Sequence, residues 1–478
     1  MNVVEPHIAS LFGLHLPPLL AAFLTVAFII FLFRRDIREK PDVSGALWLP
    51  LIWMVLICSK NVSGWLNIFG LNVSVAASAA EGNPVDACFY VALTTAAICV
   101  LNKRQVYLSE IVLNNGWLIA FLLYLSISIT WSDFPLIALR RWTKVFGHPM
   151  MALIVLTEPD FEEALKRLMK RCAYVVIPVS ILFIRYYPGL GLSYDEWSGM
   201  QIITGIAGGK NSLGEDLLIL GFFFFWHLLQ TWQTERSRER RNELFLITGF
   251  LLMIFYLLRL AHSATATISL FVAILIVLFV GIRSIKNFIG TYALAALVLL
   301  AAAELAFGIS GRLSESLGRG SNLTGRTELW AHCLEFQSNP IFGAGFESFW
   351  LGERRERIAE FYNHWSPGGS HNGYLETYLN LGLIGLCILI GLIIVTFWKI
   401  RLGLFRNFEW GRYRLGFFVA VVLHAWTEGA FGPYSTTWFV FYLIAMDYPR
   451  ALLTAAQPSV GVARSEERRE FACAEGEP

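Results

Sequence analysis

The sequence predicts an all-α polytopic membrane protein with about 12–13 transmembrane helices. Of its 478 residues, 56% are hydrophobic and 15% are charged, whereas about a quarter of the residues in a soluble protein are charged. Many apolar runs reach the roughly 20 residues that a helix needs to cross about 30 Å of hydrocarbon. These runs are continuous and do not alternate with polar residues, which indicates helices and not membrane strands.

The expected spans fall into two membrane parts separated by one long loop. We predict an N-terminal part at 1–309, an extracytoplasmic loop at 310–373, a C-terminal part at 374–448 and a polar, disordered cytoplasmic tail at 449–478. The long loop is rich in aromatic residues, so we expect it to contain short helices. In order, the expected spans are 17–33, 46–64, 86–101, 116–131, 138–157, 173–187, 214–232, 243–260, 266–282, 288–309, 374–398, 414–432 and 435–448.

Basic residues gather in every second loop, which fixes the expected register of the spans. By the positive-inside rule these loops are cytoplasmic, so the N-terminus lies outside and the C-terminus inside the bacterial inner membrane. The first span is followed, not preceded, by basic residues, so we expect no cleaved signal peptide. The basic residues are Arg34, Arg35, Arg38 and Lys40; Lys103 and Arg104; Lys166, Arg167, Lys170 and Arg171; Arg236, Arg238, Arg240 and Arg241; Arg283 and Lys286; Lys399, Arg401, Arg406, Arg412 and Arg414.

Arg326 lies at the predicted start of a short amphipathic helix in the long loop. Leu329, Trp330 and Cys333 have helical spacing, and Pro340 ends the segment. A cation in the first turn opposes the helix dipole, unless an anion docks at the helix N-terminus. Arg326 is therefore either an anion-binding residue or a surface arginine that reaches lipid headgroups.

His371 lies where the long loop re-enters the membrane. Histidine titrates near neutral pH and suits general-base work, although a histidine at an interface can also be a polar anchor. Nine residues after Asn372 come Gly382 and Gly385. We expect both glycines to lie on one helix face and to allow close helix approach.

Cationic and polar residues recur near the outer ends of other spans. Charges at membrane depth are costly and indicate function by default. Convergence of several such residues favours a phosphate-bearing ligand, and anchoring to headgroups is the alternative. The residues are Arg140, Arg141 and Lys144; Lys210 and Asn211; and Arg259 and His262.

Several chemistries have no signature in the sequence. There is no Walker A loop, no GxGxxG after a strand, no HExxH and no G-x-S-x-G elbow. The seven cysteines have neither metal-ligand nor disulfide spacing, and no broad basic face indicates nucleic acid. We therefore expect no cofactor and no metal, and an activated donor as the energy source.

Taken together, these segments resemble the O-antigen ligase and polysaccharide polymerase superfamily, closest to exopolysaccharide-production polymerases of the ExoQ type. The resemblance covers roughly 83–447. One departure, Leu386-Cys387 after the second glycine of the last motif, favours a polymerase over a ligase. The matching segments are Gly82-Asn83-Pro84-Val85-Asp86, Trp131-Ser132 with Arg140-Arg141, Gly209-Lys210-Asn211-Ser212-Leu213-Gly214, Gly325-Arg326 with Trp330, Asn339-Pro340, Gly343-Ala344-Gly345-Phe346, and His371-Asn372 with Gly382 and Gly385.

The resemblance implies transfer or polymerisation of undecaprenyl-pyrophosphate-linked oligosaccharide onto a saccharide acceptor at the outer face. It implies that His371 accepts the proton of the attacking hydroxyl and that Arg326 binds the pyrophosphate. The expected partners are the lipid bilayer and, as candidates, a chain-length regulator and a flippase. The residues expected to bind substrate are Arg140, Arg141, Lys210, Asn211, Arg259, His262 and Asn372.

A secondary transporter or flippase for lipid-linked sugars is the competing interpretation. Transporters often contain inverted repeats and helices broken at the membrane midplane, and the sequence indicates neither. Its polar candidates also collect on one predicted face. Donor trapped in reconstituted vesicles without product would favour the transporter.

The basic loops generate a topology prediction. In a cysteine-free background, single cysteines at Ser237 and Ser321 should label from opposite sides of the membrane, because these positions fall in loops of opposite predicted location. An impermeant thiol reagent applied to intact cells should label only the cysteine at 321. Labelling of both positions would contradict the assigned register.

Overall fold

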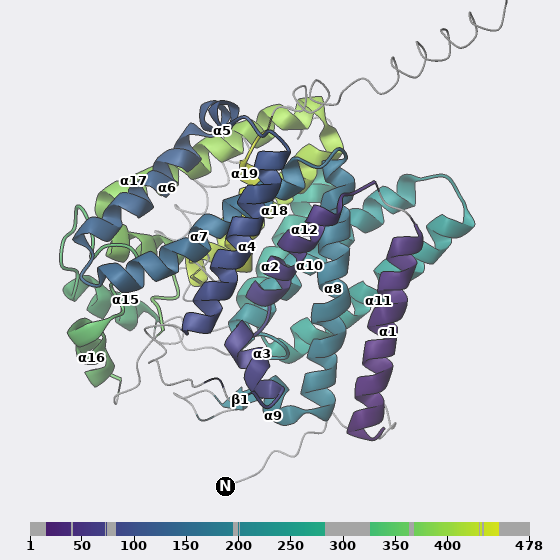
Figure 1. Ribbon diagram of the computed structural model, residues 1–478, viewed down its shortest axis with the longest axis horizontal. Helices are drawn as coiled ribbons and strands as arrows, with labels where there is room; N and C mark the ends of the chain where they lie inside the picture. Colours follow the sequence, from purple (N-terminus) through teal and green to yellow (C-terminus); the bar gives the residue numbers. More distant parts are fainter. Residues whose placement is uncertain are drawn as a thin grey trace, which may run out of the picture.

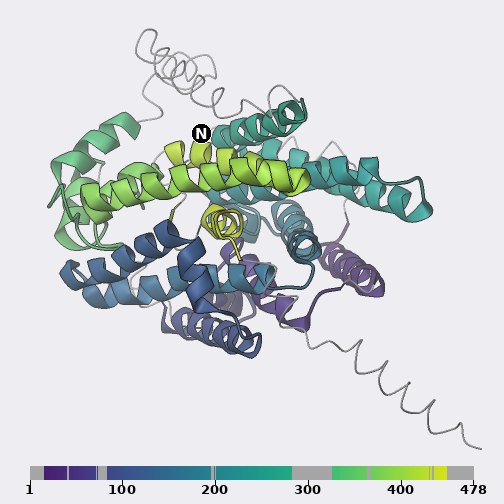
Figure 2. The ribbon, with the colours of Figure 1, turned by 90° about the horizontal axis from the view of Figure 1, so that it is seen from above.

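The structure is a computed structural model that describes residues 16–39, 42–71, 73, 83–194, 199, 201–282, 326–362, 368–429, 431–432 and 435–448. It is almost entirely helical, as predicted, and the sheet within these ranges is one short antiparallel pair. Figures 1 and 2 show the helices packed beside one another. The expected span 288–309, the loop segments 310–325 and 363–367, and the tail 449–478 lie outside the described residues.

Helices of the first half begin where the sequence supplies a proline or a cap. Pro18, Pro84 and Pro135 occupy helix N-termini, where the missing N–H has no intrahelical acceptor to lose. Asn83 and Asp160 each accept a hydrogen bond from a first-turn N–H. The elements are α1 (Pro18–Arg38), η2 (Gly45–Leu47), α2 (Trp48–Ile57), α3 (Val62–Ile68), α4 (Pro84–Lys103), α5 (Leu108–Asn114), α6 (Gly116–Ser128), η3 (Ile129–Trp131), α7 (Pro135–Leu156), α8 (Phe161–Tyr186) and α9 (Pro188–Gly191).

The second half continues the bundle and adds the described part of the long loop. Ser237, Asn372, Asn407 and Ser435 cap the helices that follow them. As predicted, short helices occur in the long loop. The elements are β1 (Leu192–Tyr194), β2 (Gln201–Ile203), α10 (Lys210–Gln233), α11 (Arg238–Ala261), α12 (Ala264–Val280), α15 (Arg326–Glu335), α16 (Gly352–Glu360), α17 (Gly373–Arg406), α18 (Phe408–Thr427) and α19 (Thr436–Ala445).

Twelve of the thirteen expected spans overlap a described helix or a bent helix pair. By length and composition alone, α1, α4, α10, α11 and α17 can cross a membrane, and the count reaches seven if each of two bent pairs is one span. The helices α12 and α19 are apolar but shorter. The helices α7, α8 and α18 carry several charged residues and do not meet this test.

Breaks in three apolar segments correct one expectation from the sequence. The axis bends by 73° between Gly45–Ile57 and Val62–Ile68, and by 100° between Leu108–Asn114 and Gly116–Trp131. The third break is at Gly382 inside α17. The sequence analysis indicated no broken helix, and the structure corrects that expectation.

The break at Gly382 arises from the close approach of the long loop. Gly382 has φ 65° and ψ −167°, and a Cβ placed on it would lie 2.1 Å from the carbonyl oxygen of Ile341. Gly382 and Gly385 therefore do not share one continuous helix face, and that expectation is wrong. The glycine admits a loop backbone, whereas Gly385 packs beside Tyr124 of α6.

Ion pairs join the basic loops that the sequence assigns to the cytoplasm. Asp36 of α1 is buried and lies 2.7 Å from both Arg167 and Arg171 of α8. Arg35 lies 2.6 Å from Glu243 of α11. Residues from three separate basic segments thus meet in one network, which supports the grouping of these loops.

The helix α18 lies at the centre of the arrangement and positions the site. It packs against α12, α17, α10 and α19. On its face toward α10, the ring of Tyr413 lies 4.5 Å from that of Trp226 and also contacts Phe417. Such aromatic packing fixes the helix axis, so the C-terminal end of α18 is held beside the first turns of α10 and α17.

The break at Gly382 gives a stability prediction. Gly382→Ala should lower the unfolding temperature of the detergent-solubilised protein, because a non-glycine residue adopts this backbone conformation only at a cost of about 1–3 kcal/mol and the new Cβ would collide with backbone. The matched control is Gly249→Ala in α11, where a Cβ meets no atom within 4 Å. That change should be neutral or stabilising by about 0.4–1 kcal/mol. Equal unfolding temperatures for the two variants would disprove the constraint.

Candidate functional site

Predicted outer-face residues converge on one carboxylate, that of Glu428, which follows α18. The side chain is 10% exposed. Oε1 accepts a hydrogen bond from Nη2 of Arg326 at 2.8 Å, and Oε2 accepts one from Nδ2 of Asn211 at 3.0 Å. Oε2 also lies 3.4 Å from Nδ1 of His371. Burying a carboxylate is costly unless it is paired and hydrogen-bonded, and these partners stabilise it.

Arg326 is the first residue of α15, as the sequence predicts. In addition to its ion pair with Glu428, its Nη1 donates to the carbonyl of Thr427, at the C-terminal end of α18. A guanidinium has five N–H donors in a rigid fork, and these two bonds use two of them. The contact with α18 therefore orients Arg326 while leaving donors for an anion.

His371 stands in a strained turn directly before α17. Its φ of 51° lies in the left-handed region that side chains rarely adopt. The turn is fixed on both sides, because Ser370 N donates to Glu376 Oε2 at 3.0 Å and Gly373 N donates to the Glu428 carbonyl at 3.1 Å. The imidazole is 37% exposed. With Nδ1 directed at Glu428, Nε2 is the nitrogen available to a substrate.

The first turn of α10 supplies Asn211 and its neighbour Lys210, as the Gly-Lys-Asn motif predicts. The first turn of α12 also contacts this end of α18. There Thr427 Oγ1 donates to Thr265 Oγ1 at 2.9 Å. The structure thus brings Asn211, Arg326 and His371 together and places Lys210 beside them along the chain.

A second acidic group, Glu347, lies in the described part of the long loop. Arg141 of α7 donates to the Glu347 carbonyl at 2.7 Å and lies 3.4 Å from its Oε2. Burial raises the pKa of the Glu347 carboxyl to about 7, with Arg141 opposing this rise and Glu376 adding to it. A carboxyl that titrates near neutral pH suits proton transfer.

Tight backbone packing holds Glu347 in place. Its own φ is 52°, and the preceding Gly345 has φ 88°. A Cβ on Gly345 would lie 2.3 Å from Cα of Ser132. The Ser132 hydroxyl in turn lies 2.5 Å from that of Ser348. The Gly-Ala-Gly-Phe segment of the long loop and the Trp-Ser segment before α7 are thus packed against each other.

A small cavity of about 50 Å³ separates Glu347 from the Glu428 cluster. Its lining includes Glu347, Gly373 and Gly429. The two glycines directly follow Asn372 and Glu428 in the sequence. This volume holds a few water molecules but no sugar ring, so any saccharide must occupy the more open side of His371.

The other four candidate residues lie on α7, on α11, directly after α11 and at the N-terminus of α17. Asn372 accepts two backbone N–H bonds through Oδ1 and caps α17, so its side chain has a structural task. Arg140, Arg259 and His262 are exposed near helix ends. For these four residues, a role in substrate binding stays a prediction.

The sequence analysis missed Glu428 because it assigned the residue to the expected span 414–432. An acidic residue within an apolar segment is by itself a signal of function, and that signal was present. The hydrogen-bond partners of Glu428 could not be predicted from the sequence, since Arg326 lies 102 residues away and Asn211 lies 217 residues away in the chain.

Comparison with known proteins gives two matches. Residues 248–390, which include Arg326 and His371, match the sequence model of a family described as O-Antigen ligase. The chain is also 28% identical over 299 residues to "Exopolysaccharide production protein ExoQ" of Rhizobium meliloti (strain 1021). This alignment covers 59% of the chain and 63% of the relative, so the match spans less than two thirds of the relative's length.

The raised pKa of Glu347 generates a prediction about stability and pH. A carboxyl whose pKa rises to about 7 on folding binds a proton more tightly in the folded state. Stability should therefore fall as pH rises from the usual glutamate range to about 7. In Glu347→Gln this slope should be absent, and thermal unfolding measured between pH 4 and 8 checks it. Ser348→Ala is the control, because it changes stability without removing a titrating group. An unchanged slope in Glu347→Gln would contradict the shift.

Proposed function

Because this chain belongs to an O-antigen ligase/ExoQ-like family, we propose that it transfers or polymerises oligosaccharide repeat units carried on undecaprenyl pyrophosphate. The reaction takes place at the outer face of the bacterial inner membrane and serves exopolysaccharide synthesis. The acceptor is a saccharide hydroxyl. The N-terminus lies outside and the C-terminus in the cytoplasm, an orientation supported by the basic loops.

The observation that carries this proposal is the shared carboxylate of Glu428. It fixes a guanidinium and an imidazole, two groups that the transfer needs side by side. An anionic leaving group needs preorganised cations, and a sugar hydroxyl needs a base. Burial of Glu428 strengthens both contacts, because charges interact more strongly away from water.

In the proposed step, the acceptor oxygen attacks the anomeric carbon of the donor. A new glycosidic C–O bond forms while the C–O bond to pyrophosphate breaks, and the bonding electron pair leaves with the pyrophosphate. The hydroxyl proton passes to Nε2 of His371, while Nδ1 faces Glu428. Arg326, with Lys210 nearby, binds the departing pyrophosphate. These cations can stabilise the negative charge on the leaving pyrophosphate, so we propose a metal-independent reaction without a cofactor.

Glu347 has a supporting role in this proposal. Its carboxyl lies across a cavity large enough for a few water molecules from the residues that adjoin Glu428. Since its pKa is about 7, it can exchange a proton with water in that cavity at neutral pH. We propose that it returns the proton taken up by the site to bulk solvent.

A flippase or transporter is the second candidate, and the broken helices favour it in one respect. Transporters use unwound backbone to bind their cargo. At the break in α17, however, Leu383 N donates to the Pro340 carbonyl at 2.9 Å and Ile384 N to that of Ile341 at 3.3 Å. The long loop therefore occupies these N–H groups, and transfer chemistry accounts better for the adjacent His371 and Arg326.

The catalytic proposal predicts the effect of removing the imidazole. His371→Ala should insert and bind donor normally, yet form glycosidic bonds about 10²–10⁴-fold more slowly. The loss should persist at saturating donor, because a base acts in the transition state. Product formation by purified protein in vesicles, with synthetic lipid-linked oligosaccharide, measures this.

The matched control is His332→Ala, a histidine of α15 that stacks on Phe361 with 4.0 Å between ring centroids. It should retain near-normal turnover. Glu428→Gln tests positioning: its rate should fall, because the carboxylate that holds the guanidinium of Arg326 and the imidazole of His371 in place is lost. Near-normal turnover of His371→Ala would refute the assignment and direct the search for the base to Glu347.

A further inference from the structure

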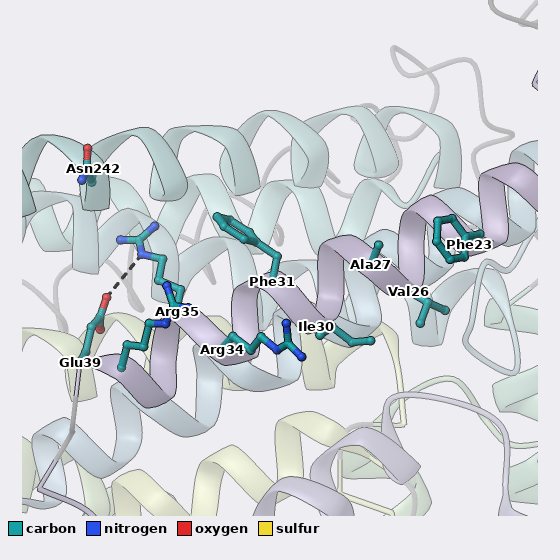
Figure 3. A pocket seen from close by; sticks show the side chains of 10 residues that line it. Phe23, Val26, Ala27, Ile30, Phe31, Arg34, Arg35, Glu39 and Asn242 are labelled. Atoms are coloured by element: carbon teal, nitrogen blue, oxygen red, sulfur yellow. Dashed lines mark ion pairs between the residues drawn. The ribbon is translucent and has the colours of Figure 1, made fainter.

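A groove of about 760 Å³ runs along α1. Figures 1 and 2 place α1 on the opposite side of the molecule from α15 and α16, so the groove is separate from the proposed catalytic site. Figure 3 shows apolar side chains along α1 and arginines gathered at one end. Its lining includes Phe23, Ala27, Arg34, Arg35, Arg38 and Asn242.

The groove exists because the described residues cover little of α1. It packs on α8, and only Ala21, Leu32 and Asp36 of its residues are buried. Asn242 of α11 completes one wall (Figure 3). In a bilayer, an uncovered apolar helix face is filled by lipid chains.

Unneutralised positive charge lies at one end of the groove. Asp36 beneath it is already held by two arginines of α8. Arg35 is engaged by Glu39 and Glu243. Arg34 and Arg38 are exposed, and neither has an ion pair within the described part of the chain.

We propose that this groove binds one anionic phospholipid, with an acyl chain along the apolar residues and its phosphate at Arg34 and Arg38. The eleven-residue rise from Phe23 to Arg34 corresponds to about 16 Å of helix, close to half of the roughly 30 Å hydrocarbon core. The groove therefore matches the depth of a single leaflet. Basic residues at this depth attract anionic headgroups, and arginine binds phosphate through its planar fork.

The chemistry of the groove favours a phospholipid over the polyprenyl donor. Its arginines belong to a loop that the sequence assigns to the cytoplasm, whereas Arg326 and His371 belong to the opposite set. The lipid would sit where α1 meets α8 and α11 and would cover the face of α1 that the described residues leave open. This inference does not depend on the proposed catalytic function.

Native mass spectrometry of the purified full-length chain tests the proposal. Titration with phosphatidylglycerol should show one site that phosphatidylcholine fills much more weakly. In the Arg34→Ala, Arg38→Ala double variant the affinity for phosphatidylglycerol should fall about 25-fold, from a factor of about five for each basic residue. Ala27→Trp keeps every arginine but fills the groove, and it should lose binding as well.

The matched control is Lys103→Ala with Arg406→Ala, which removes two exposed basic residues from the ends of α4 and α17. Its affinity should change less than twofold. The proposal would be overturned if the two phospholipids bound equally well, or if the double variant kept its affinity for phosphatidylglycerol. It would also be overturned if the control lost as much affinity as the double variant, or if Ala27→Trp bound phosphatidylglycerol fully. Stronger binding of undecaprenyl phosphate than of phosphatidylglycerol would assign the groove to polyprenyl lipid instead. If the double variant does not fold, Ala27→Trp alone decides the outcome.

Discussion

The buried carboxylate of Glu428 is the interaction on which the arrangement of the site depends. A charge with this little exposure must be compensated, and the compensation comes from Arg326 and Asn211, with His371 beside them. These residues arrive from α15, α10 and the turn before α17. Satisfying one charge therefore brings three separate segments to the end of α18. The same contacts orient the guanidinium and the imidazole before any substrate arrives, as electrostatic preorganisation requires.

The long loop forms the second half of the site because its backbone packs without intervening side chains. Gly343 and Gly345 lie where a Cβ would meet the backbone of α17 and of Ser132, and Gly382 receives the loop in return. This packing holds Glu347 beside Arg141. A cavity that admits only a few waters then separates the two acidic groups. Glycine thus allows the loop backbone to approach a helix closely, as small residues allow two helices to approach each other elsewhere in membrane proteins.

The two polar clusters differ in how their charges are used. Around Asp36 and Glu243, acidic and basic side chains pair and join α1, α8 and α11. Around Glu428, one carboxylate serves several donors, and part of His371 is left open to solvent. The first pattern joins helices. The second leaves the imidazole of His371 partly exposed and N–H donors of Arg326 available for a ligand. The groove along α1 adjoins the first cluster and is covered by no protein in the described ranges.

From the sequence alone we could predict the helical membrane class, the positions of twelve described helices, the grouping of the basic loops, and Arg326 and His371 as candidate site residues. These follow from hydrophobic run length, from charge patterning and from short motifs, all of which are local. The packing of distant segments was needed to show that Glu428 joins them, that Gly382 breaks α17 and that Glu347 lines a small cavity together with Gly373 and Gly429. Each depends on contact between segments distant in the chain. Burial, which sets the cost of a charge and the room beside a glycine, exists only once those segments have packed.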